Sequence, residues 1–459
     1  MLKLAVFLLI ATCSYGQSQF NTTLLDHWYQ DSLVAASTQM RYNECFGFEI
    51  DGREYAVVGS TEGSHFFELS DQNTFLDRGF IEGKYNHPLV VHRDYAIYQN
   101  YIYAVCDEGE SSLQIIDLSQ LGQGNPQLIA ENDSIFARVH NIFIDTNEAL
   151  LYACSITEMN NGTVISDRSM RVFSLVNPSS PSLIYSGPSD IPEVHDCYAR
   201  DNIAILNCGF DGIRVYNFSN PSSPQLLQSM EFYQDQGYNH QGWLSDDGCN
   251  YIFGDETNGK QLKFCSVSNN QVTIENLFGT NWQDESVPHN VQISGKYAFV
   301  AYYNEGLRIY DISGNTTVEI AHFDTHPIDE PLFKMRGAWG VHARYKSDRI
   351  IVSDRVHGLY LIAFDREPFE PSSNEDLILF PSILAQGEVM TGRLLVDGIS
   401  EFDIKIVSMD GKLMKDFHVS DQSYWLHEMN YAQGAYNLIL TYFNYLGEEQ
   451  RIIERFAIH

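Results

Sequence analysis

The sequence predicts an all-β protein, a seven-bladed β-propeller followed by a small C-terminal β-sandwich. Three observations support this fold class. One unit of short strands and turns recurs along the chain, the spacing of the copies is that of propeller blades, and the composition favours strands. Hydrophobic residues make up 44% of the chain and aromatic residues 13%, which suits large sheets.

The repeat is clearest where His289 opens the segment HNVQISGKYAFVAYYNEGLRIYDIS. A histidine begins an alternating strand, a polar turn and a second apolar run follow, and a glycine precedes the third run. The other copies that open on a histidine start at His92, His140, His195, His240 and His342. These six histidines are spaced by 48, 55, 45, 49 and 53 residues, close to the roughly 40 to 50 residues of one blade. A copy without the histidine starts at Cys45, which brings the predicted number of blades to seven.

Four segments are predicted along the chain. Residues 1–16 have the basic start and apolar run of a signal peptide, and no other stretch is long and apolar enough to cross a membrane. Residues 17–365 form the propeller. Its last copy ends in GLYLIAF with no fourth strand, so Leu24 to Trp28 are predicted to supply that strand and close the ring. Residues 366–376 read as a polar linker, and residues 377–459 as the β-sandwich.

The charge balance restricts the partners. Asp and Glu total 60 against 28 for Lys and Arg, which gives a formal charge of −32. A field of this sign repels nucleic acid and favours cations or basic partners. A well-solvated secreted surface has the same composition, so the charge by itself does not define a binding patch.

If the copies superpose, their histidines lie around one mouth of the central channel. The candidates for this ring are His92, His140, His195, His240, His289 and His342, with Glu44 near the place of the missing histidine. Asp94, Asp196 and Glu193 are neighbouring carboxylates. Two roles remain open for the ring. Imidazoles can bind a divalent metal such as zinc, copper or nickel, for which His195, His240 and His289 are the candidates. They can equally bond backbone groups of the adjoining blade.

Two loop features are weaker candidates for ligand binding. Asp255 and Glu256 form an acidic turn that could hold calcium, although the spacing is not that of an EF-hand, and ordinary solvated turns have the same composition. Tyr238 and Trp243 could stack on sugar rings or pack within a blade. The sequence contains no nucleophile elbow, phosphate loop or HExxH motif, so no catalytic residue is assigned.

Two families resemble parts of this chain. The strand endings LQIIDLS, IRVYNFS and LRIYDIS resemble the LVIVD repeat. Together with HRD at His92, HQGWL at His240, HN at His289 and GAWGVH from Gly337, they resemble the choice-of-anchor B family. The pieces FPS from Phe380, KIVSMDGK, YAQGAYNLIL and RFAIH resemble the type IX secretion C-terminal sorting domain of Bacteroidetes. These resemblances imply a propeller that the type IX secretion machinery delivers to the outside of the cell.

The expected function is therefore that of a secreted or cell-surface module that binds an extracellular protein or glycan without catalysis. The alternative is a metal-dependent hydrolase or lyase working in a channel lined by histidines. A third option is an adhesin whose acidic face binds calcium or sugars.

Overall fold

The computed structural model describes residues 19–458 apart from 37, 112, 133–134, 161–162, 281–285, 315–316, 327–334, 365–376, 381–382, 385–388, 395–400, 410, 421–423 and 444–448. The predicted signal peptide at 1–16, the linker at 366–376 and part of the FPS motif lie outside these residues. The described part is built from β-strands, and it contains no helix able to cross a membrane. The chain divides into two compact units, Met1–Asp365 and Arg366–His459.

The first unit contains seven antiparallel sheets in its described part. The first sheet contains β3 (Tyr42–Ile50), β4 (Arg53–Ser60), β5 (Gly63–Leu69) and β6 (Phe75–Glu82), and the second contains β7 (Arg93–Tyr98), β8 (Tyr101–Cys106), β9 (Leu113–Asp117) and β10 (Gln127–Asn132). The third contains β11 (Arg138–Asp145), β12 (Leu150–Asn160), β13 (Thr163–Ser174) and β14 (Ser182–Ser186). The fourth contains β15 (Asp196–Arg200), β16 (Ile203–Asn207), β17 (Ile213–Asn217) and β18 (Gln225–Met230).

The fifth sheet contains β19 (Asn239–Leu244), β20 (Asn250–Asp255), β21 (Leu262–Ser268) and β22 (Gln271–Phe278). The sixth contains β23 (Val291–Ser294), β24 (Tyr297–Ala301), β25 (Leu307–Asp311) and β26 (Val318–Phe323), with β1 (Gln19–Phe20) at the edge. The seventh contains β27 (Ala338–His342), β28 (Arg349–Asp354) and β29 (Gly358–Phe364), with β2 (Thr22–Trp28) at the edge. Polar turns separate the strands, and second strands such as β8, β16 and β24 are buried along nearly their whole length, so their sheets are covered on both faces.

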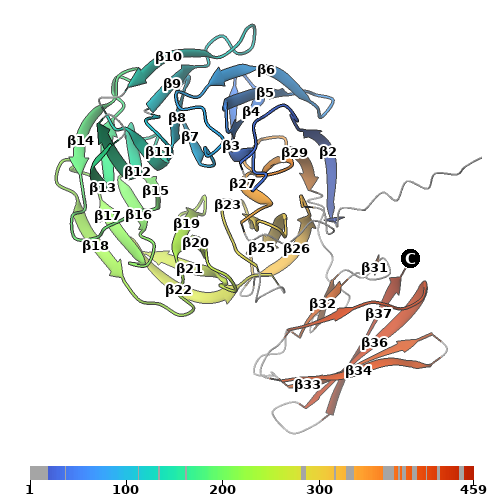
Figure 1. The fold of residues 1–459 in the computed structure, drawn as a ribbon. Coiled ribbons are helices and arrows are strands. Elements are labelled where there is room, and N and C mark those ends of the chain that lie inside the picture. Colours follow the sequence, from blue (N-terminus) through green and yellow to red (C-terminus); the bar gives the residue numbers. More distant parts are fainter. Residues whose placement is uncertain are drawn as a thin grey trace, which may run out of the picture. The chain divides into compact units, whose positions relative to one another are not determined.

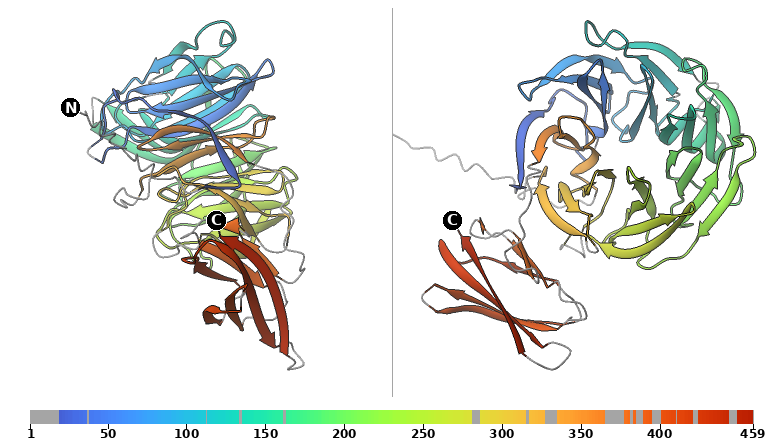
Figure 2. Two further views of the ribbon diagram at one scale, coloured as in Figure 1. Left: turned by 90° about the vertical axis from the view of Figure 1, so that its right-hand side faces the viewer. Right: turned by 180° about the vertical axis from the view of Figure 1, so that it is seen from behind.

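The seven sheets stand in a ring around a central axis, with the first strand of each sheet innermost (Figures 1 and 2). Each sheet shares a buried apolar cluster with the sheet on either side. Side chains also join neighbouring innermost strands. Asp94 Oδ2 accepts the Ile142 amide at 2.7 Å, and Gln241 Oε1 accepts the Val291 amide at 2.8 Å. Because these bonds satisfy buried amides, they fix the inner strands around the channel.

The last sheet takes its outer strand from the N-terminal segment. β2 pairs antiparallel with β29, and Trp28 lies opposite Leu359. The Trp28 ring also contacts the first sheet, 5.6 Å from Tyr42 and 4.9 Å from Phe67 between ring centroids. This is the position that the sequence analysis gave to Leu24 to Trp28. The strand therefore links the beginning and the end of the first unit.

The second unit contains a three-stranded and a five-stranded sheet in its described part. Their strands, in spatial order, are β30 (Leu377–Phe380), β32 (Val389–Leu394) and β35 (Tyr424–Glu428), and then β31 (Ile383–Leu384), β37 (Glu449–Ile458), β36 (Gly434–Phe443), β33 (Phe402–Ser408) and β34 (Leu413–Val419). Met390 and Trp425 of the smaller sheet share one buried cluster with Ile404, Leu438 and Ile452 of the larger sheet. This unit therefore has a core of its own.

Candidate functional site

Five of the six predicted histidines form a continuous series of ring contacts at the innermost strands. The centroid distances are 5.4 Å for His92–His140 and 4.3 Å for each of His140–His195, His195–His240 and His240–His289. Trp339 of β27 completes the circle, 3.8 Å from His289 and 5.3 Å from His92. These six side chains are called the histidine ring below. Each lies at the start of an innermost strand, which is where the repeat placed the histidines.

His342 does not hold the place in the histidine ring that the sequence predicted for it. Trp339 stands there instead, and the His342 ring packs against Phe46 and Tyr345, with centroids 5.7 and 4.7 Å away. Trp339 is the second residue of β27, as His240 is of β19, whereas His342 is the last residue of β27 and lies three positions further along the strand. Gly340 follows Trp339, and a Cβ atom there would meet Glu44 Oε1 at 1.9 Å.

His195 and His289 each join two neighbouring sheets. His195 Nδ1 lies 3.0 Å from the His240 carbonyl oxygen, and His289 Nδ1 lies 2.6 Å from the Trp339 carbonyl oxygen. A carbonyl only accepts hydrogen bonds, so Nδ1 carries the proton in both rings and Nε2 keeps the lone pair. Burial lowers the pKa of both imidazoles well below its usual value, so both are neutral at pH 7. His195 and His289 thus have the role of bonding backbone groups of the neighbouring sheet.

His92 and His140 face carboxylates instead. His92 Nδ1 lies 2.6 Å from Glu108 Oε1, and His140 Nδ1 lies 2.9 Å from Asp107 Oδ2. Burial by itself lowers the pKa of His140, but the hydrogen bond to Asp107 and the charge of that carboxylate outweigh it and raise the pKa to about 9. One side of the histidine ring therefore carries a charged imidazole, while the other side carries neutral ones.

Glu44 lies outside the ring contacts but beside them. Its Oε2 accepts a hydrogen bond of 2.7 Å from Asn290 Nδ2, next to His289, and its Oε1 accepts the Cys45 amide at 3.0 Å. Burial, together with the neighbouring Asp94 charge, raises the pKa of Glu44 well above its usual value. Burial likewise raises the pKa of Asp196 well above its usual value, and that of Asp94 to about 7. A group of carboxyls that resists ionisation thus lies near the ring.

Asp255 and Glu256 are adjacent in sequence but have different surroundings. Glu256 points to the ring, with Oε2 3.9 Å from His240 Nε2, and its Oε1 accepts a short hydrogen bond from the Tyr303 hydroxyl. Among the described residues, ligand atoms of His240, Glu256 and His289 all lie within 4.8 Å of one another. This places two predicted metal candidates, His240 and His289, beside a carboxylate. The third candidate, His195, is the next ring along, 4.3 Å from His240 between centroids.

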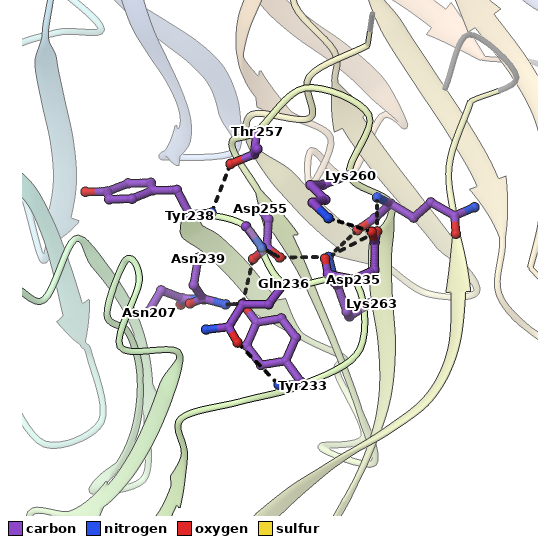
Figure 3. Close-up of polar contacts among 12 residues, drawn as sticks. Asn207, Tyr233, Asp235, Gln236, Tyr238, Asn239, Asp255, Thr257, Lys260 and Lys263 are labelled. Carbon is purple, nitrogen blue, oxygen red and sulfur yellow. Dashed lines mark hydrogen bonds and ion pairs between the residues drawn. The ribbon is translucent and has the colours of Figure 1, made fainter. Parts of the chain in front are cut away.

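Asp255 instead anchors the segment 231–238, called the anchored loop below. Its Oδ2 pairs with Lys263 Nζ at 2.8 Å, and neither side chain is exposed to solvent. Its Oδ1 accepts the Tyr233 hydroxyl at 2.7 Å. Lys263 Nζ also donates to the carbonyl oxygens of Asp235 and Gln261 at 2.8 and 2.7 Å. Figure 3 shows Tyr233 and Lys263 at Asp255, with Asp235 on the other side of Lys263. All three Lys263 donors are satisfied, so this buried charge is structural.

The anchored loop brings Tyr238 beside the histidine ring. The Tyr238 ring lies 5.2 Å from both His195 and Phe210 between centroids. Phe210 and Phe232 are 75% and 86% exposed, far more than aromatic side chains of the core. Gln236 Nε2 donates to the carbonyl oxygens of Phe210 and Glu231, at 3.2 and 3.0 Å, and so joins the turn before β17 to the loop. Exposed aromatic side chains thus stand on a fixed backbone.

Trp243 is separate from this surface. It lies inside β19, and its half-buried ring packs 5.2 Å from Tyr198 and 6.0 Å from Phe143 between centroids. The structure therefore gives it the packing role, which was the alternative to ligand binding. Phe143 lies in β11, and Arg344, whose guanidinium carbon is 5.9 Å from the Trp243 ring, follows β27. Both come from sheets two places away around the ring, so Trp243 packs among the innermost strands along the channel.

A second group of ligand atoms, from His326, Asp354 and His357, lies within 4.8 Å. Here the carboxylate is already used. Asp354 Oδ1 accepts the amides of Val356 and His357 at 2.8 Å each, and Oδ2 accepts the Thr325 hydroxyl at 2.8 Å. These bonds shape the turn before β29, so the group serves the fold.

Comparison with known proteins supports the repeat and the architecture. Residues 288–321 match the LVIVD repeat, a repeat family found in β-propeller proteins. This stretch runs from beside His289 through β23, β24 and β25 into β26. A comparison with curated proteins gave no match.

Two solved structures align with much of this chain. The crystal structure of RRP9 WD40 repeats aligns with a TM-score of 0.50 and 13% identity, covering 72% of this chain and 98% of that chain. The computationally designed Ika8 protein aligns with a TM-score of 0.47 and 10% identity, covering 75% of this chain and 99% of that chain. At such identity the WD40 likeness concerns the fold alone. The sheets, the repeat and this likeness define a β-propeller repeat fold.

Proposed function

We propose that this protein is a secreted or cell-surface seven-bladed β-propeller that binds an extracellular protein or glycan without catalysis. In this proposal each of the seven sheets is one blade. The binding surface is the channel mouth, formed by the histidine ring, the anchored loop and Phe210. In a propeller the repeated strands form the scaffold, and the turns at one face supply the residues that bind a specific partner. These side chains lie in or beside such turns.

One observation carries the proposal, namely that two exposed aromatic side chains, which cost free energy in water, stand on backbone that is held in place. Lys263, Asp255 and Tyr233 fix the anchored loop, which presents Phe232. Gln236 ties the turn that presents Phe210 to this loop. A rigid aromatic surface loses little conformational entropy when a partner binds. Glu193 and Glu231 flank the same turns, so the surface suits sugar rings or basic groups.

The test is a binding screen with the full-length protein. Immobilised glycans and basic polypeptides are presented to the protein at about 0.15 M salt, and binding is measured by biolayer interferometry. We expect a ligand whose affinity falls at least about tenfold when Phe210 and Phe232 are both changed to serine. Phe443→Ser, which alters a 59% exposed phenylalanine of the second unit, is the matched control. Absence of any ligand, or equal binding by the double variant, would contradict the proposal.

The second unit is proposed to be a β-sandwich that serves as a type IX sorting domain and places the protein outside the cell. Support comes from the motifs KIVSMDGK and YAQGAYNLIL, which overlap β33 and β36 of the larger sheet. In a bacterium with a type IX system, the chain lacking residues 377–459 should accumulate in the periplasm, while the complete chain reaches the medium or the cell surface. Equal export of both chains would exclude this role.

A metal-dependent hydrolase or lyase is the second candidate, because His240, His289 and Glu256 meet at the channel mouth. It predicts hydrolysis of simple aryl esters or lactones that requires added zinc and is lost in His289→Gln. Zinc-independent turnover, or the same turnover in the variant, would exclude it.

A further inference from the structure

We propose that His240, His289 and Glu256 bind one divalent transition-metal ion, with zinc as the best match. Two imidazole nitrogens and one carboxylate are a ligand set that zinc uses in open sites, where a fourth position is left for water or another ligand. The same set also suits other first-row divalent metals. The site goes beyond the proposed binding role and does not depend on it.

The ligand atoms are already close to the spacing that a metal needs. Two atoms about 2.1 Å from a tetrahedrally coordinated ion lie about 3.4 Å apart. His240 Nε2 and Glu256 Oε2 are 3.9 Å apart, and one ligand atom from each of the three residues falls within 4.8 Å of the others. The separation must therefore shrink by about 0.5 Å for His240 and Glu256, and by at most about 1.4 Å for the other pairs.

The surrounding hydrogen bonds prepare two of the three ligands, His289 and Glu256. His289 Nδ1 donates to the Trp339 carbonyl oxygen at 2.6 Å, so Nε2 carries the lone pair that a metal requires. This Nε2 is buried and has no hydrogen-bond partner among the described residues, which is costly unless a ligand satisfies it. Tyr303 holds Glu256 Oε1, which leaves Oε2 directed at His240.

Charged groups of both signs surround the three ligands. His140 and Arg355 are the nearby cations, and Glu256, Glu108 and Asp107 supply negative charge around the same mouth. His195 stands next to His240 and borders the open fourth position.

The test measures metal binding by the full-length protein after removal of metal with a chelator. Titration with Zn²⁺ and with Co²⁺ should give one bound ion per chain, and Co²⁺ should show the visible absorption of a four- or five-coordinate site. Glu256→Gln and His289→Gln should each weaken binding at least about 100-fold. Tyr303→Phe, which frees Glu256 Oε1, should weaken it about 10-fold.

Two matched variants test whether the loss of metal affinity is specific to the three ligands or follows from any change at the channel mouth. Glu193→Gln removes a mouth carboxylate outside the three ligands, and His92→Gln removes a ring histidine paired with Glu108. Both should keep the affinity within about threefold. No stoichiometric metal in the folded wild type, or equal losses in the controls, would overturn the proposal. If a ligand variant fails to fold, the rise in Tm of the wild type with Zn²⁺, and its reduction in Tyr303→Phe, decide the question.

This outcome is distinguishable from that of the proposed function. Phe210 and Phe232 are not ligand residues, so their replacement tests partner binding without changing the metal site. The protein can bind metal and no glycan or polypeptide, or the reverse.

Discussion

A single imidazole can serve the fold and a ligand at the same time. In His289, Nδ1 bonds the backbone of the next sheet while Nε2 remains available. The sequence posed packing and ligand binding as alternatives, because it cannot show the two ring nitrogens separately. The two roles are compatible, because the hydrogen bond from Nδ1 to the backbone orients the ring and also fixes the tautomer whose Nε2 lone pair can bind a metal.

His140 should make the stability of the protein depend on pH. Its folded pKa of about 9 exceeds the usual 6.5, so the stabilisation is complete below pH 6.5 and is lost as the pH rises through 9. The stability lost on His140→Gln should therefore shrink between pH 6.5 and 9.5. Urea denaturation of both proteins across this range measures it, and a loss that is the same at every pH would refute the Asp107 pairing.

The sequence predicted the residues of the site mainly where they recur from copy to copy of the repeat. Five histidines could be placed because each copy puts one at the same strand position. Trp339 and Tyr303 could not, since each occurs in one copy, and His342 lies three positions after the strand position that Trp339 occupies in the ring. Asp255 and Glu256 looked equivalent, and only the position of Lys263 distinguishes the structural carboxylate from the one at the mouth.

At the scale of elements, the turns between the second and third strands of the sheets supply the mouth. Asp107 and Glu108 follow β8, Phe210 follows β16, Glu256 follows β20 and Tyr303 follows β24. These turns occupy the same place in each copy, so aligning the copies and comparing this one turn would have found the missing residues. The strands are alike because they pack, and the turns differ because packing does not constrain them.

The anchored loop should depend on its buried ion pair. Lys263→Met leaves Asp255 buried without a counter-charge, which should destabilise the first unit by about 3–5 kcal/mol. Chemical denaturation, followed through the transition of that unit, gives the loss. The double variant Lys263→Met with Asp255→Asn should recover much of it, because no unpaired charge remains. A double variant as unstable as the single one would show that the charges are not what matters.

β2 should hold the ring closed through Trp28. This ring packs between the last sheet and the first, so Trp28→Ala should cost about 3 kcal/mol of the unfolding free energy. Leu24→Ala, on the same strand at a 38% exposed position, should cost less than about 1 kcal/mol. Thermal unfolding of the two variants makes the comparison. Similar losses would mean that β2 contributes strand pairing but no packing between sheets.

For the whole molecule, the fold was more predictable than the site. Alternating apolar residues and recurring turns predict strands even when the pairing of each strand is unknown. The absence of a fourth strand after GLYLIAF predicts that the N-terminal segment pairs with the last sheet. The buried contacts between sheets could not be foreseen residue by residue, because they join positions about fifty residues apart, such as Gln241 and Val291.

The two units should unfold independently, because each has its own buried core. Deleting residues 377–459 should leave the Tm of the first unit within about 2 °C of its value in the complete chain. Differential scanning calorimetry of both chains tests this. A larger fall in Tm would reveal a stabilising interface between the units.

The pairing of β2 with β29 sets the order of events when the chain is made. His27 and the His357 carbonyl oxygen that it contacts are separated by 330 residues, so the first strand waits unpaired until nearly the whole ring has been synthesised. A chain interrupted before β29 would leave both ends of the ring open to proteases. The pairing of β2 with β29 can therefore form only in a chain that already contains the whole first unit.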